Sequence, residues 1–128
     1  MSNRKTGNRF EAKFCDLLFN KGFWVLNVTQ NQAGQPADII AVKNGFPSLI
    51  DCKVCENDKF QLSRVEENQR LSMELWEDCG NGQGWFALKT SKGIYMITLS
   101  DLLDLRKFKT SLNITDIIEN SVSLEKWL

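Results

Sequence analysis

Apolar residues recur at helical spacing in the first part of the chain. They predict a helix over residues 8–21, ended by Gly22, with an apolar stripe formed by Phe10, Phe14, Leu17 and Leu18. Short stretches rich in branched and aromatic residues then predict three strands, at 23–29, 37–43 and 48–54. A polar loop at 30–36 separates the first two strands, and Asn44-Gly45 between the other two is typical of a tight hairpin turn.

The second half of the chain returns to helical spacing before two more strand patterns. Ser63 followed by Glu66 matches a capping box, so a helix is expected from about Arg64 to Asp78. The elements expected after it are a glycine-rich loop at 79–84, strands at 85–90 and 94–99, a helix capped by Ser100 or Asp101, and short helices in the tail 110–128.

The order helix, three strands, helix, two strands, helix predicts an α/β fold, with a mixed sheet flanked by helices. The 128 residues fit one domain over 1–128, with a core at about 7–99 and a C-terminal helical tail at about 100–128. We assign Trp24, Trp85 and Phe86 to the hydrophobic core rather than to the stacking of nucleic-acid bases.

The net charge of the chain excludes few classes of function. The chain has 16 basic and 16 acidic side chains, and this neutrality argues mildly against nucleic-acid binding, which is largely electrostatic. The basic residues nevertheless cluster near the start, where they form either a phosphate-binding arm or a solvated terminus: Arg4, Lys5, Arg9 and Lys13. The chain has no histidine, which excludes Ser-His and Cys-His nucleophile pairs and histidine metal sites.

The four cysteines do not form a convincing zinc site. Cys52 and Cys55 make a CxxC, but residues three apart on a strand point to opposite faces, and no second CxxC exists. We therefore interpret them as small buried apolar residues. The first residues, polar and basic with no apolar run behind them, do not resemble a secretory signal, so reduced thiols and a cytoplasmic location are expected.

Charged residues interrupt the second and third predicted strands. Asp51 and Lys53 are two residues apart and project from one face of the third strand, and Asp38 is the single acid of the second. A two-residue turn at Asn44-Gly45 would put Asp38 opposite Asp51, and a loop two residues longer would put it opposite Lys53. Both registers place the three side chains on one face.

Two carboxylates held this close repel each other unless a cation compensates. A divalent metal such as Mg²⁺, bound by oxygen ligands and substrate phosphates, would do so, and the lysine would add positive charge nearby. The pattern alone is also compatible with a buried Asp-Lys ion pair in which Asp38 bonds to backbone.

At these residues the chain resembles the PD-(D/E)xK nucleases. Pro36-Ala37-Asp38 stands at the PD position with one residue inserted, and Asp51-Cys52-Lys53 is a (D/E)xK. The resemblance extends over about residues 7–99 to Holliday junction resolvases, especially those of the RecU type (penicillin-binding-protein-related factor A). It is carried by Gly7-Asn8-Arg9-Phe10-Glu11, by residues 34–53, and by the segment from Phe60-Gln61-Leu62 to Gln69-Arg70-Leu71.

This resemblance implies a restriction-endonuclease-like fold and a homodimer that cuts branched DNA with Mg²⁺ or Mn²⁺. It assigns metal binding to Asp38, Asp51 and the backbone carbonyl of Cys52, and makes Lys53 the catalytic lysine. Glu11 would be an acid that helps to hold metal or water, and Gln69 would face the site from the second helix. A first-turn acid that suits the helix dipole and an inward glutamine that satisfies backbone groups are the structural alternatives for these two.

The sequence departs from the RecU pattern in two respects. Asp51 stands where that family more often has glutamate, and the chain leaves no room for the long insertion that enters the junction. We therefore expect a Mg²⁺-dependent endonuclease acting on branched DNA, with two alternatives. These are a restriction or repair nuclease of the same superfamily, and a catalytically silent DNA- or protein-binding domain.

Overall fold

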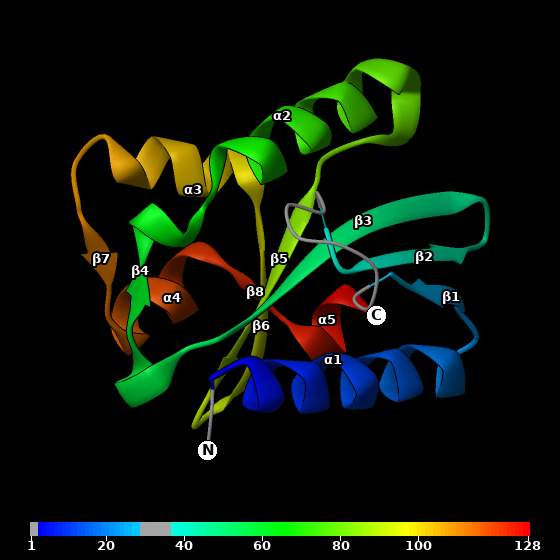
Figure 1. Ribbon diagram of the computed structural model, residues 1–128, viewed down its shortest axis with the longest axis horizontal. Helices are drawn as coiled ribbons and strands as arrows, with labels where there is room; N and C mark the ends of the chain where they lie inside the picture. The colour runs from blue at the N-terminus through cyan, green and yellow to red at the C-terminus, as the bar shows by residue number, and fades with distance from the viewer. Residues whose placement is uncertain (1–2, 29–36) are drawn as a thin grey trace.

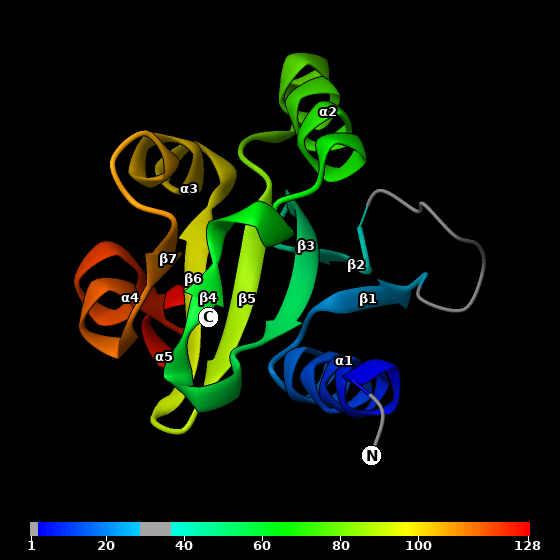
Figure 2. The ribbon, with the colours of Figure 1, turned by 60° about the vertical axis from the view of Figure 1, so that its left-hand side comes forward.

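A central sheet separates two layers of helices. The computed structural model describes residues 3–28 and 37–128, and the side chains of the first helix from Arg9 onward. Helix α1 (Asn3–Asn20) covers one face of the sheet, and α2 (Glu67–Trp76) and α3 (Leu99–Arg106) cover the other (Figures 1 and 2). This is the α/β arrangement that the order of elements predicts.

The sheet has six strands in the order β1-β2-β3-β5-β6-β8. Their bounds are β1 (Trp24–Asn27), β2 (Ile39–Lys43), β3 (Phe46–Val54), β5 (Trp85–Thr90), β6 (Gly93–Thr98) and β8 (Val122–Ser123). Among the described strands, only β3 and β5 pair in parallel, which requires the long crossover that contains α2. The predicted mixed sheet is therefore confirmed.

Several short elements give no periodic signal in the sequence. They are the 3₁₀ turns η1 (Glu56–Asp58) and η2 (Leu62–Arg64), the π turn η3 (Glu77–Asn81), and the paired strands β4 (Phe60–Gln61) and β7 (Ser111–Leu112). The short helices predicted in the tail 110–128 are present as α4 (Ile114–Asn120) and α5 (Leu124–Trp127). The residues after Leu99 nevertheless belong to the core, because they contribute the buried side chains of Leu102, Leu112, Ile117 and Leu124.

The β2–β3 hairpin decides between the two registers left open by the sequence. Lys43 pairs with Phe46 and Ile39 with Ile50, so the loop has two residues. Asn44 and Gly45 take φ values of 53° and 81°, the left-handed pair that a type I′ turn requires. The longer loop is wrong, because Pro47 lies within the pairing opposite Val42.

The core consists of two apolar clusters, one on each face of the sheet. The cluster under α1 includes Phe10, Phe14, Leu18, Ile39, Ile50 and Cys52. The cluster under α2 and α3 includes Leu49, Cys55, Phe60, Met73, Phe86 and Leu88. Cys52 and Cys55 thus lie on opposite sides of the sheet, as the strand spacing predicts.

Three helix starts differ from the sequence prediction, and the first of them is that of α1, which begins at Asn3 instead of residue 8. Helix α2 begins at Glu67 with a capping box of Glu66 and Gln69, whereas Ser63 lies in the turn η2 that buries Leu62 in the core. Helix α3 is capped by Thr98, whose hydroxyl accepts from the Asp101 N–H at 3.1 Å. The predicted caps at Ser63, Ser100 and Asp101 are wrong, because core burial and the direct passage from β6 into α3 fix where these helices begin.

The three aromatic residues assigned to the core have different environments. Phe86 is fully buried, Trp85 is half-buried, and Trp24 is 60% exposed. The prediction for Trp24 is wrong because β1 is an edge strand, and this face of it is left largely uncovered. Among residues 3–28 and 37–128, no helix is both long and apolar enough to cross a membrane.

Candidate active site

Two hydrogen bonds hold Asp38 to β3, at the residues before and after Asp51. It immediately precedes β2, and its N–H donates to the Ile50 carbonyl at 3.1 Å. Its Oδ2 accepts from the Cys52 N–H at 2.8 Å. The β2–β3 register continues by one step to put Asp38 beside Asp51, because Ile39 pairs with Ile50. The hairpin turn thus brings together two acids that are separated by twelve residues of chain.

Asp51 is an acid in an apolar setting. It is only 2% exposed, and its strand neighbours on β5 include the fully buried Phe86. Burial raises the pKa of Asp51 well above its ordinary value, and the nearby negative charge of Asp38 raises it further. Lys53 acts in the opposite direction, with its Nζ 3.0 Å from Asp51 Oδ2. The single lysine therefore does not compensate both carboxylates.

Glu11 reaches the same strand from the other face. It is 8% exposed on α1, and its carboxylate is near enough to contribute to the raised pKa of both the Cys15 and Cys52 thiols. Burial is the larger cause at both cysteines, and Asp38 also acts on both. Three acidic side chains therefore surround Cys52, although they come from α1, the start of β2 and β3.

The donor set suits a hard divalent cation. Oδ2 of Asp51 is buried and finds no donor with hydrogen-bond geometry in the described part of the chain, although Lys53 Nζ is close. The carboxylates of Asp38 and Asp51 are oxygen ligands of the kind that Mg²⁺ prefers. Among residues 3–28 and 37–128, no group of three acidic or cysteine side chains is assembled into a complete metal cage. That is expected where phosphate and water supply the remaining ligands.

Gln69 has a clear structural contact. It is 6% exposed, and its Oε1 accepts from the Glu66 N–H at 3.3 Å as part of the capping box of α2. This contact is the structural alternative for Gln69, an inward glutamine that bonds to a backbone group. Helix α2 packs through Met73 on the face of the sheet that carries Asp51, and Gln69 fixes the start of this helix.

The basic residues of the N-terminal segment are only partly described. Arg9 and Lys13 lie exposed one turn apart on α1, the helix that carries Glu11. The side chains of Arg4 and Lys5 are outside the described residues. Two exposed cations beside the buried acids are consistent with contacts to a DNA backbone, which carries one phosphate per nucleotide.

Asp38 makes the backbone hydrogen bond expected in the alternative of a structural Asp-Lys ion pair, but the residue types do not show which backbone group is its partner. The Cys52 N–H that holds Asp38 is a backbone group, and it would be the same whatever residue stood between Asp51 and Lys53. The type of side chain therefore could not reveal it. Only the register of the hairpin, which the Asn44-Gly45 turn predicts, could have placed that N–H beside Asp38.

Comparisons with known proteins found a family and a fold for the chain. A family model described as archaeal Holliday junction resolvase (Hjc) matches residues 1–128. Among solved structures, the chain is similar to Hjc from the archaeal hyperthermophile Archaeoglobus fulgidus, described as a Holliday junction resolvase. That match has a TM-score of 0.71 at 14% identity and covers 94% of this chain and 98% of the other. A search of curated proteins gave no match.

Proposed function

The chain belongs to the archaeal Holliday junction resolvase family, and we propose that it cuts branched DNA by Mg²⁺-assisted phosphodiester hydrolysis at Asp38, Asp51 and Lys53. Its family makes it a structure-specific, metal-dependent nuclease, as the sequence predicts. The observation that carries the proposed site is the close approach of two acids on one face. Asp38 is hydrogen-bonded to the Cys52 N–H at 2.8 Å, and Asp51 is almost fully buried beside it.

Asp38, Asp51 and the Cys52 carbonyl would hold the metal ion. When bound, a divalent ion polarises the phosphate and lowers the pKa of a water, so that hydroxide forms near neutral pH. Asp51 would have to be ionised to bind the metal ion; burial and the charge of Asp38 raise the pKa of its carboxyl, and the ammonium of Lys53 opposes that rise. The β2–β3 hairpin holds both carboxylates in place before substrate arrives, which avoids the cost of ordering them during the reaction.

Lys53 lies on the same face of β3 as Asp51. Its ammonium contacts Asp51 Oδ2 at 3.0 Å, and its side chain is only 12% exposed. From this position it would orient the attacking water and stabilise the negative charge that develops on the phosphate oxygens. The ion pair alone could also be structural, so a cleavage experiment has to separate the two roles.

Glu11 and Gln69 are assigned supporting roles. Glu11 would accept a hydrogen bond from a water of the metal ion or from the attacking water, since it is buried near Cys52. Gln69 would act as a positioning residue through the cap of α2. Arg9 and Lys13, together with Arg4 and Lys5, would bind DNA phosphates. The expected cytoplasmic location stays a prediction.

The test is cleavage of a labelled four-way junction, a flap and a linear duplex, with Mg²⁺ or with EDTA. The parent protein is expected to cut the junction with Mg²⁺ only. Asp51→Asn and Lys53→Ala should each lose about a hundredfold or more of the rate, the scale of removing one electrostatic group from such a site. Asp104→Asn is the matched control, because Asp104 is an exposed acid on α3.

Three outcomes would contradict the proposal. Cleavage that persists in EDTA would remove the metal from the mechanism. Junction binding without cleavage, unchanged in Asp51→Asn, would favour a silent binding domain. Cleavage of the linear duplex at one sequence would indicate a restriction enzyme.

We further propose that the working form is a homodimer that pairs through the uncovered face of β1 and β2. Trp24 and Leu26 are 60% and 44% exposed there, opposite Val42 and Ile40. This apolar patch continues along β2 to Asp38, since Ile40 and Asp38 share a face. A partner bound there would bring its own active site close, which suits paired cuts in a branched substrate.

Light scattering at high concentration tests this assembly. The parent is expected to be a dimer and Trp24→Glu a monomer, because a charge cannot be buried in an apolar interface without a partner. Phe108→Glu is the control, since Phe108 is 86% exposed and outside the patch. A parent that stays monomeric, or a Trp24→Glu variant that stays dimeric, would contradict this interface.

A further inference from the structure

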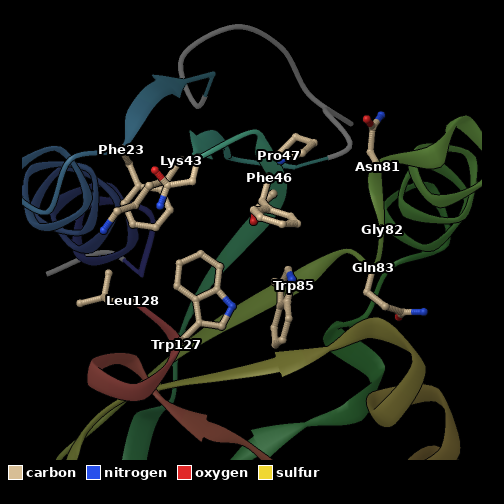
Figure 3. Close-up of a pocket in the computed structure, with 12 residues that line it drawn as sticks. Phe23, Lys43, Phe46, Pro47, Asn81, Gly82, Gln83, Trp85, Trp127 and Leu128 are labelled. Carbon is tan, nitrogen blue, oxygen red and sulfur yellow. The ribbon is translucent and has the colours of Figure 1, made fainter.

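A pocket of about 430 Å³ opens at the hairpin end of the sheet, away from the acids (Figure 3). It is lined by the hairpin residues from Lys43 to Ser48, by Phe23, by Asn81 to Gln83, and by Trp85, Trp127 and Leu128. Side chains alternate between the two faces along β3, so Phe46 and Ser48 project from the face opposite to Asp51. The pocket therefore lies on the α1 side of the sheet and the aspartate pair on the other. Along β3, the strand rises by about 17 Å over the five residues from Phe46 to Asp51, so the pocket and the acids are also separated along the strand.

Aromatic rings form the walls of this pocket. The rings of Phe23 and Trp127 are stacked, with centroids 5.6 Å apart and planes 7° apart. Trp85 meets Trp127 edge-on, with centroids 5.8 Å apart. Phe46 projects from the hairpin into the same space, where 76% of its surface stays exposed (Figure 3). A hollow bounded by flat rings favours a flat ligand, because stacking needs a second planar surface.

A lysine at the rim offers a local contact for an anionic group. Lys43 has its Nζ 5.1 Å from the centre of the Phe23 ring. None of the described lining residues has an acidic side chain, although Leu128 carries the terminal carboxylate, and the other polar side-chain groups are amides, the indole N–H groups of Trp85 and Trp127, and the hydroxyl of Ser48. The pocket therefore combines a stacking surface, a cation and neutral hydrogen-bonding groups, which together match the base and phosphate of a nucleotide.

We propose that this pocket binds an unpaired nucleobase of a DNA strand, stacked on the aromatic walls, with Lys43 at its phosphate. A base inside a duplex is stacked on its neighbours and cannot enter, so the pocket selects single-stranded DNA. The site is separate from the cutting reaction and requires neither metal nor Asp51. It would give a branched substrate a second contact on the α1 side of the sheet.

The experiment titrates the full chain with a short oligothymidylate in EDTA and follows tryptophan fluorescence. Quenching is expected with the single strand and much less with a duplex of equal length. Phe46→Ala should weaken binding by about five- to a hundredfold, the range found for loss of one base-stacking ring. Lys43→Ala should weaken binding and reduce the salt dependence by about 0.7 in the log–log slope. Phe46 is exposed, so its substitution should leave the fold intact.

Controls locate the signal and separate this inference from the proposed cleavage. Trp24→Phe should keep the quenching, because Trp24 is outside the pocket, whereas Trp127→Phe should lose part of it, because Trp85 still lines the pocket. The same titration with Asp51→Asn should be unchanged, so the inference can fail or succeed whether or not the chain cuts DNA. Unaltered binding in both Phe46→Ala and Lys43→Ala would overturn the assignment. A change in tryptophan fluorescence with N-acetylphenylalaninamide but not with the oligonucleotide would overturn it in favour of a peptide side chain.

Discussion

At the scale of single residues, charge and burial conflict at Asp51. An acid that is 2% exposed and beside a second acid has a raised pKa, because water is excluded and the Asp38 charge is near. A buried charge of this kind destabilises the folded state unless a cation neutralises it. Without a metal ion, this buried carboxylate is therefore expected to lower the free energy of unfolding of the protein.

Asp51→Asn should consequently raise the stability of the metal-free protein while it removes cleavage. We expect the unfolding temperature in EDTA to rise by about 3–5 °C, which corresponds to roughly 1 kcal/mol for a domain of this size. Addition of Mg²⁺ should raise the unfolding temperature of the parent but not of Asp51→Asn. Calorimetry with and without Mg²⁺ measures both effects. A variant that unfolds well below the parent in EDTA would show that Asp51 is instead a stabilising ion-pair partner of Lys53.

The cysteines give a second prediction at this scale. Burial, with smaller contributions from Asp16 and Glu11, raises the pKa of the Cys15 thiol to about 11. A raised thiol pKa means that little thiolate is present at pH 8, and that its fraction grows about tenfold for each pH unit up to that pKa. With a coloured disulfide reagent at pH 8, Cys79, the exposed cysteine, should react first. Cys15 should react slowly, at a rate that climbs with pH.

Single variants identify the phases. Cys79→Ser should remove the fast phase, and Cys15→Ser should remove the pH-dependent one. If the reaction at pH 8 instead shows two fast thiols in the folded protein, the low accessibility and raised pKa of Cys15 are both wrong.

At the scale of elements, the approach of α2 to the start of β5 is very close. A side-chain carbon added to Gly84 would lie 2.4 Å from Cγ and Sδ of Met73, far inside contact distance. Met73 is fully buried in the cluster that includes Phe86, so it has little room to move away. Glycine at this position therefore allows α2 to pack closely against the sheet.

Gly84→Ala should destabilise the protein by about 1–3 kcal/mol, the usual cost of overpacking a core. Urea unfolding measures this difference. Met73→Ala in the same chain should recover part of the loss relative to the sum of the two single variants, because it removes Cγ and Sδ, the two closest of the clashing atoms. Strict additivity of the two changes would contradict this contact.

At the scale of the whole molecule, the last residues complete the sheet and core. Strand β8 pairs with β6, and Leu124 of α5 is buried in the cluster under α1. Trp127 stacks on Phe23 at the other end of the chain. The segment expected as a helical tail thus joins the start of β1 to the far edge of the sheet.

Deletion of residues 121–128 should therefore lower the stability of the entire domain. We expect a loss of about 3–5 kcal/mol in urea unfolding, comparable to the removal of a large buried side chain. Glu125→Ala, a change at an exposed position of the same helix, should leave the urea midpoint unchanged. An equal midpoint for the deleted and full chains would show that this segment is only an accessory to the fold.

The sequence by itself determined the elements whose signals are local. The period of α1, the Asn44-Gly45 turn and the strands from Phe46 to Thr98 follow from spacing and turn chemistry, and they are sufficient to place Asp38, Asp51 and Lys53 on one face. The same locality predicts that Cys52 and Cys55 diverge. These features depend on neighbours a few residues away, so a single chain reveals them.

Only the tertiary structure decided which surfaces are covered. The start of α2, the partner of the Gln69 amide, the exposure of Trp24 and the pocket between Trp85 and Trp127 all depend on elements far apart in the chain. Burial is a property of the whole packing, and an aromatic residue has the same sequence pattern in a core, on an edge strand or at the wall of a pocket. For the same physical reason, the sequence could align two acids across a hairpin, but only the packed molecule shows that Asp51 is shut away from water.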